Sequence, residues 1–159
     1  MNREITKKQR SSSPTWEPRI VAFLCRWCSY AGTDLAGVSR LSYPPTTRVI
    51  LVPCSSRVSP YHIVKALMEG ADGVLVSGCH PGDCHYLTGN LLVRRRFILL
   101  KRLLNYLGIE EARVQFSWIS ASEGEEFAGL IRGITEKVRA VGPFKGFLRD
   151  DMEEDFHVI

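Results

Sequence analysis

Residues 74–85 read VLVSGCHPGDCH, a run of apolar side chains that leads directly into a loop. The loop, residues 78–85, holds two cysteines, two histidines, two glycines and a proline. A short apolar run that stops at a glycine- and proline-rich loop predicts a buried strand, here over residues 72–77. The loop therefore lies at the carboxyl end of a predicted strand.

The remaining cysteines follow apolar runs of the same kind. Residues 19–24 lead into Cys25 and Cys28, and residues 47–52 lead into Cys54. Because the carboxyl ends of parallel strands share one edge of a sheet, residues that follow such strands gather at that edge. We therefore expect all five thiols of the chain to converge there.

Helical patterns alternate with the strands along the rest of the chain. The strands are predicted at 19–24, 47–52, 72–77 and 113–119, and the helices at 31–41, 60–69, 90–108 and 122–141. This alternation predicts an α/β fold in which helices cover both faces of a parallel sheet. We expect a single domain of three layers, flavodoxin-like or Rossmann-like, with about four strands.

Three helices carry more detailed signals. Ser59 before Pro60 predicts an N-cap, and Ser122 with Glu125 predicts a capping box for the last helix. The apolar face of the longest helix is assigned to Leu91, Leu92, Ile98, Leu103, Leu104 and Leu107. Its polar face is assigned to Arg94, Arg95, Lys101, Arg102 and Asn105. Such a basic face is usually solvated, and docking of an acidic partner is the alternative.

Composition divides the chain into three parts. The 159 residues are 45% hydrophobic and 24% charged, as in an ordinary globular protein, with a net charge of +4. Residues 1–15 are predicted to be a disordered basic tail, 16–143 the folded domain, and 144–159 an acidic and aromatic tail able to dock on a partner. We find no signal peptide, no apolar stretch that spans a membrane and no nucleic-acid motif, so we expect a cytoplasmic protein.

Clustered thiols in a reducing compartment favour metal or redox chemistry over structural disulfides. Iron–sulfur clusters need four cysteine thiolates, and Cys25, Cys28, Cys54, Cys79 and Cys84 supply five candidates. A structural zinc site on Cys25, Cys28, Cys79 and Cys84 is one alternative. A dithiol oxidoreductase using Cys25 and Cys28 is another. Because no dinucleotide fingerprint, Ser–His–Asp pattern or carboxylate pair is found, an electron relay is favoured.

Several neighbours of the cysteines are candidates for supporting roles. His80 and His85 are expected to donate hydrogen bonds near the cluster rather than to bind it, although two histidines bind one iron in Rieske centres. Gly78 and Gly82 are expected to expose backbone N–H groups beside an inorganic core. We expect Trp27, Tyr30 and Tyr86 to keep water away or to form an interface. His62 and His157 are expected to be solvated.

Five segments resemble the delta subunit of methyl-viologen-reducing hydrogenase. They are residues 23–32, 34–40, 69–76, 78–86 and 118–125, and the resemblance covers about residues 16–143 without either tail. It implies an iron–sulfur protein with one 2Fe–2S cluster. Spacing alone permits a 4Fe–4S cluster equally well.

The resemblance also implies a place in a larger oxidoreductase complex. The chain would be a non-catalytic relay, inactive alone, that takes electrons from the hydrogenase small subunit or from another donor such as formate dehydrogenase. It would pass them to the flavin-bearing subunit of heterodisulfide reductase. The cysteine motifs of the family correspond to all five thiols, so one is a spare, and we expect it to be Cys54 or Cys28.

Overall fold

The computed structural model describes residues 16–146 and contains one all-parallel sheet with the strand order β2-β1-β3-β4. The strands are β1 (Ile20–Cys25), β2 (Thr47–Val52), β3 (Gly73–Gly78) and β4 (Val114–Trp118). All six residues of β3 are buried, as expected for an inner strand of a parallel sheet that is covered on both faces. The predicted α/β fold is confirmed.

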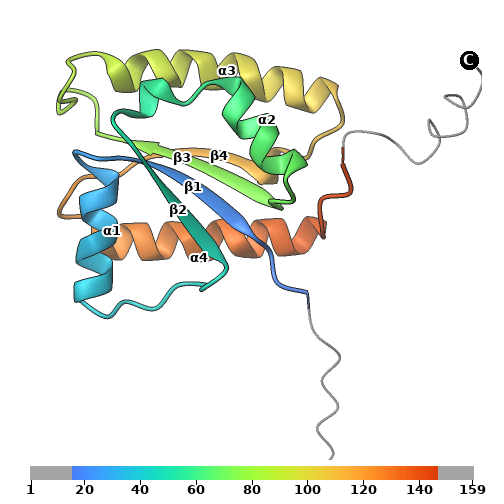
Figure 1. Ribbon diagram of the computed structural model, residues 1–159, viewed down its shortest axis with the longest axis horizontal. Coiled ribbons are helices and arrows are strands. Elements are labelled where there is room, and N and C mark those ends of the chain that lie inside the picture. The colour runs from blue at the N-terminus through green and yellow to red at the C-terminus, as the bar shows by residue number, and fades with distance from the viewer. Residues whose placement is uncertain (1–15, 147–159) are drawn as a thin grey trace, which may run out of the picture.

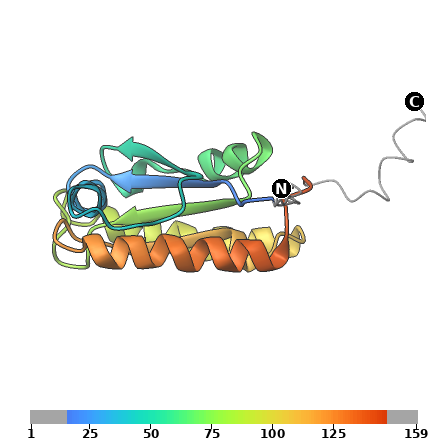
Figure 2. The ribbon, with the colours of Figure 1, turned by 90° about the horizontal axis from the view of Figure 1, so that it is seen from below.

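Four helices and two short 3₁₀ turns complete the domain. The helices are α1 (Ser29–Val38), α2 (Pro60–Met68), α3 (Gly89–Tyr106) and α4 (Gly124–Val141), and the turns are η1 (Ser55–Arg57) and η2 (Glu111–Arg113). Figure 1 shows α2 and α3 above the sheet and α1 and α4 below it. Seen from below, β1 and β2 lie at the side of the molecule away from α4 (Figure 2). Every predicted element lies within three residues of the observed one at each end.

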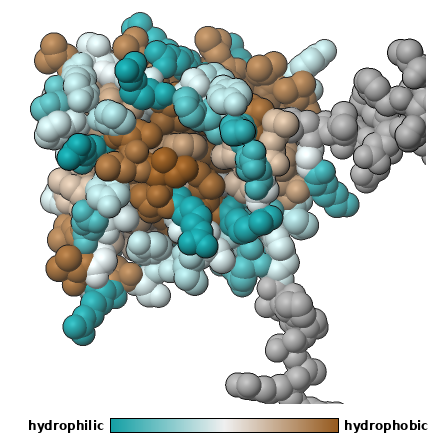
Figure 3. Space-filling view, in the orientation of Figure 1, coloured by the Kyte–Doolittle hydropathy of each residue, from teal (hydrophilic) through white to brown (hydrophobic). Residues whose placement is uncertain are grey.

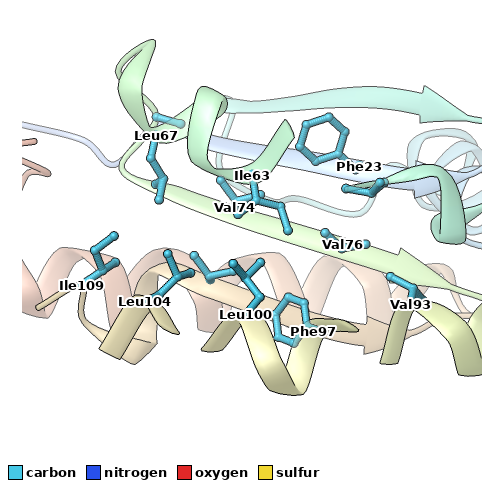
Figure 4. Close-up of a cluster of buried hydrophobic side chains, with 13 residues drawn as sticks. Phe23, Ile63, Leu67, Val74, Val76, Val93, Phe97, Leu100, Leu104 and Ile109 are labelled. Atoms are coloured by element: carbon cyan, nitrogen blue, oxygen red, sulfur yellow. The ribbon is translucent and has the colours of Figure 1, made fainter. Parts of the chain in front are cut away.

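Each face of the sheet has its own hydrophobic core. Figure 4 shows the first core, in which Val93, Phe97, Leu100 and Leu104 of α3 point toward the sheet. The second core packs α4 and α1 against the other face through Ile20, Leu24, Leu75, Phe127, Ile131, Ile134 and Val138. Outside these cores, an apolar hollow of about 400 Å³ lies between α2 and the exposed part of β1 and β2 (Figure 3).

The predicted apolar face of α3 was wrong. Of the six residues assigned to it, Leu104 is buried, whereas the other five are more than a third exposed. The buried residues recur at Val93, Phe97, Leu100 and Leu104, the spacing of one helix face. Leucines occur around most of the helix, so periodicity alone did not identify the side that faces the sheet.

The capping signals had mixed outcomes. Ser59 is the N-cap of α2, as predicted, and its backbone N–H donates to Nδ1 of His62 at 3.1 Å, so His62 completes a capping box. The predicted pair of Ser122 and Glu125 was wrong. Helix α4 begins at Gly124, and Glu123 accepts the backbone N–H of Ser120 at 2.7 Å.

The predictions for the two tails, including His157, fall on residues 1–15 and 147–159, outside the described part of the chain. Within residues 16–146, none of the helices is both long and apolar enough to cross a membrane.

Candidate metal centre

All five cysteines meet at the carboxyl edge of the sheet and form one buried cluster. Cys25 ends β1, Cys28 is the N-cap of α1, and Cys54 is the N-cap of η1. Cys79 directly follows β3, and Cys84 lies in the loop before α3. Each residue is at most 7% exposed, and each thiol is free. The predicted convergence of the thiols is therefore confirmed.

Three of the sulfur atoms form the tightest group. The sulfurs of Cys25, Cys28 and Cys79 all lie within 4.8 Å of one another, and Cys25 Sγ lies 3.9 Å from Cys79 Sγ. They come from two adjacent strands, β1 and β3, whose ends the parallel pairing brings side by side. These three side chains offer separate ligand atoms to a shared metal centre.

Cys54 and Cys84 lie against the first residue of α3. A Cβ added at Gly89 would lie 2.5 Å from Cys54 Sγ and 3.4 Å from Cys84 Sγ. The missing side chain of Gly89 thus makes room for two sulfur atoms, which no other residue type allows without displacing one. In addition, the Ser56 hydroxyl donates a hydrogen bond to Cys54 Sγ at 3.2 Å.

The two glycines singled out in the loop differ in their surroundings. A Cβ at Gly78 would lie 2.4 Å from Ser55 Oγ, so Gly78 lets η1, and with it Cys54, pack against the end of β3. Gly82 adopts a φ of +96° and has open space around it. Gly78 therefore serves close packing, and Gly82 serves the turn of the exposed loop.

The histidines of the loop are engaged with other side chains. His80 Nε2 lies 2.7 Å from Glu123 Oε2, which joins the loop to the start of α4. The backbone N–H of Ser120, together with His80, holds the pKa of Glu123 below its ordinary value. The ring of His85 stacks on Trp27 with 3.7 Å between centroids. Neither histidine belongs to the group of three ligand atoms around Cys25.

The aromatic residues expected near the thiols divide between two places. Tyr86 contacts His85 edge-on, with ring centroids 4.9 Å apart, and Trp27 covers the other face of His85. Trp27 and Tyr86 are each about half exposed, at 48% and 49%. Tyr30, in contrast, packs against the second core. The exposed tip of the cysteine loop is therefore lined by Trp27, His85 and Tyr86.

Sequence reasoning missed Asn90 and Glu123. Asn90 is 1% exposed, and its side-chain amide donates to the carbonyl oxygens of Cys79 at 3.0 Å and His80 at 2.7 Å. It therefore fixes the backbone on both sides of the loop's first turn. An asparagine at the start of an otherwise apolar helix was the available signal for Asn90. The contact between Glu123 and His80 spans 43 residues and left no local signal.

The thiols hold negative charge unevenly. Hydrogen bonding with the Cys28 thiol lowers the pKa of Cys25 to about 5 and raises the pKa of Cys28. Burial raises the pKa of Cys79. One thiolate is thus stable in this cluster, whereas further thiolates need a cation beside them to offset their burial. A group of buried sulfurs with this requirement fits a metal ion or an iron–sulfur core.

Comparisons with known proteins agree with this chemistry. Residues 20–142 match the family described as "Methyl-viologen-reducing hydrogenase, delta subunit". The chain is 55% identical over 128 residues to the vhc iron–sulfur subunit of the F420-non-reducing hydrogenase of Methanococcus voltae, and the match covers 80% of this chain and 89% of that protein. It is also 55% identical over 133 residues to the iron–sulfur subunit of the F420-non-reducing hydrogenase of Archaeoglobus profundus, with 84% and 97% covered.

A further relative is much longer than this chain. It belongs to the ferredoxin/F420H2-dependent CoB–CoM heterodisulfide reductase of Methanosarcina acetivorans, and one of the subunits of that enzyme is 47% identical to this chain over 126 residues. The match covers 79% of this chain but 16% of that protein. In that protein, a segment like this domain is therefore part of the same polypeptide as the rest of the reductase subunit.

Proposed function

Since the chain belongs to the family of the methyl-viologen-reducing hydrogenase delta subunit, we propose that it is an electron-transfer subunit that carries one 2Fe–2S cluster. The observation that carries the proposal is the meeting of five buried thiols at one edge of the sheet. Four of them, from Cys25, Cys28, Cys54, Cys79 and Cys84, bind the cluster. When bound, such a cluster accepts and releases one electron at a time.

The surrounding residues support the site in distinct ways. Gly89 leaves space beside two of the sulfurs, and Asn90 holds the backbone of Cys79 and His80. The contact between His80 and Glu123 ties the loop to α4. Burial of every cysteine keeps water from the sulfur atoms, which helps to set the potential of a cluster.

The partners follow from the relatives. Two of them are named as hydrogenase iron–sulfur subunits, so a nickel–iron hydrogenase, through its small subunit, is the electron donor of this proposal. The long relative contains a similar domain within a heterodisulfide reductase subunit, in one chain. The flavin-bearing subunit of heterodisulfide reductase is therefore the acceptor. Formate dehydrogenase is the alternative donor that the family resemblance implies.

The decisive measurement is the electron paramagnetic resonance spectrum of anaerobically purified, dithionite-reduced protein, with iron, sulfide and zinc measured on the same sample. We expect a reduced-cluster signal, about two irons and about two sulfides per chain. About four irons and four sulfides would overturn the 2Fe–2S assignment in favour of a 4Fe–4S cluster. A silent spectrum with about one zinc would overturn the relay itself.

Single Cys→Ser variants test the ligand set. We expect Cys79→Ser and Cys84→Ser to lose most of the bound iron, and one variant of the five, Cys54→Ser or Cys28→Ser, to retain it. Circular dichroism of each variant checks that the fold is kept. Unchanged iron content in both loop variants would contradict the proposed site.

One observation favours a zinc site as the second candidate. Zinc binds thiolates at about 2.3 Å in a tetrahedron, which places its sulfur ligands about 3.8 Å apart. The 3.9 Å between Cys25 Sγ and Cys79 Sγ is close to that spacing. A dithiol oxidoreductase is less well supported, because its attacking thiol must be accessible and Cys25 is 1% exposed.

A further inference from the structure

Helix α3 leaves a long apolar strip in solvent. We define the α3 surface by its exposed apolar residues, which are Leu91, Leu92, Ile98, Leu99, Leu103 and Tyr106, from 36% to 88% exposed. In Figure 1, α3 forms the outer layer of its side of the domain. The outward side of a helix on a globular protein is normally polar, and contiguous exposed apolar residues are typical of interaction sites.

The same helix is strongly basic. It contains Arg94, Arg95, Arg96, Lys101 and Arg102 and has no acidic residue. Three of these cations have partners on the domain: Arg96 donates to Ser56 O, Lys101 pairs with Glu111, and Arg94 lies over the Trp118 ring. Within residues 16–146, Arg95 and Arg102 form no ion pair, and both are exposed. A matching partner surface carries carboxylates.

The α3 surface is continuous with the cysteine site. Helix α3 starts at Gly89, against Cys54 and Cys84, and Leu91 and Leu92 follow within its first turn. Just before the helix, Leu87 is 84% exposed at a φ of +63°. A branched side chain is costly in this backbone conformation, and such strain is typical of functional positions. A protein bound along α3 therefore also reaches the exposed tip of the cysteine loop.

We propose that the α3 surface, extended by Leu87, is where the electron acceptor of the proposed function docks, through an apolar strip flanked by carboxylates. The inference rests on the proposed function and adds to it the surface and the chemistry of the contact. Charge argues against a second copy of this chain, because a two-fold contact between two α3 surfaces would bring like charges together. The acidic residues 150–155 make segment 147–159 the competing occupant.

Binding to the purified flavin-bearing subunit of heterodisulfide reductase from the same source tests the proposal. The protein, loaded with its cluster, is compared with the double variant Leu92→Ser/Leu99→Ser, whose side chains are 44% and 66% exposed. We expect an affinity at least about tenfold weaker, since buried apolar anchors dominate interface energies. Val38→Ser and Met68→Ser, which alter exposed apolar residues on α1 and α2, are matched controls and should change the affinity less than about twofold.

Charge reversal supplies a second readout. Arg95→Glu with Arg102→Glu should slow association with the flavin-bearing reductase subunit and remove most of the salt dependence of the association rate, because rim charges act mainly on this rate. Iron content and the reduced-cluster spectrum are measured on every variant. They are expected to match the unmodified protein, so a failure of docking is distinguished from a failure of the cluster.

Three results would overturn the proposal. The first is an unchanged affinity of the leucine double variant for the reductase subunit while its iron content is normal. The second is loss of binding to the hydrogenase with binding to the reductase retained, which would give the surface to the electron donor. The third is an affinity more than about fivefold higher in a chain that ends at Gly146, which would show that residues 147–159 occupy α3.

Discussion

Helices α3 and α4 have the same length and lie on opposite faces of the sheet, yet they use their apolar residues differently. Each has 18 residues. The buried residues of α4 include Phe127, Ile131, Ile134 and Val138, and its charged residues have both signs. Helix α3 buries one apolar stripe and exposes a second one beside an all-positive set of charges. The comparison shows that α4 serves the fold alone, whereas α3 has apolar surface beyond what the fold uses.

The largest difference between the helices is expected in stability. Phe127 of α4 is fully buried and meets Tyr43 edge-on, so Phe127→Ala should lower the free energy of unfolding by about 3–5 kcal/mol. Leu99 of α3 is 66% exposed, and Leu99→Ala should change it by less than about 0.5 kcal/mol. Urea denaturation monitored by circular dichroism measures both. A cost of several kcal/mol for Leu99→Ala would show that α3 is packed against something and would break the comparison.

The sequence was sufficient for the fold and for the meeting of the thiols. Apolar runs that alternate with helical patterns define a parallel sheet, and each cysteine follows such a run. Parallel pairing then brings Cys25 and Cys79 to neighbouring strand ends, whatever the details of the loops. Both predictions depended on topology, which local patterns specify well.

The sequence was insufficient wherever the outcome depends on which side of an element faces a neighbour. In α3, leucines on both sides gave two possible apolar faces, and the one predicted was wrong. The ligand set has the same difficulty, because all five thiols lie in one cluster. The contact of His80 with Glu123, and the role of Asn90, depend on distances between loops that no spacing in the sequence specifies.

A glycine in each helix gives a second, intermediate contrast. A Cβ at Gly89 would lie 2.5 Å from Cys54 Sγ, so Gly89→Ala should cost about 1–3 kcal/mol and displace that thiol. Gly133 lies inside α4 with open space around it, so Gly133→Ala should stabilise the protein by about 0.5–1 kcal/mol through helix propensity. Urea denaturation and bound iron per chain are the measurements. Reduced iron in the Gly133 variant, or equal stability of the two variants, would contradict the assignment of Gly89 to the thiol site.

The two helices are joined near their carboxyl ends by one buried arginine. Arg113 is 1% exposed, and its Nε donates to Glu110 Oε2 at 2.6 Å, shortly after the end of α3. Its Nη2 donates to the carbonyl oxygens of Val141 at 3.5 Å and Pro143 at 3.4 Å, at the end of α4. The Arg113 guanidinium lowers the pKa of Glu110 below its ordinary value of 4.5. This link makes part of the stability depend on pH.

The smallest expected effect is the acid sensitivity of that link. Because folding lowers the pKa of Glu110, its contribution is complete above about pH 4.5 and is lost as the pH falls through the lowered value. Glu110→Gln should therefore reduce the free energy of unfolding near neutral pH and flatten its decline below pH 4.5. The side chain is 45% exposed, so the difference should be no more than about 0.5–1 kcal/mol. Glu136→Gln removes the more exposed ion pair with Arg139 in α4 and should cost less. If the two variants lost equal stability at neutral pH, the buried arginine would not couple the helix ends.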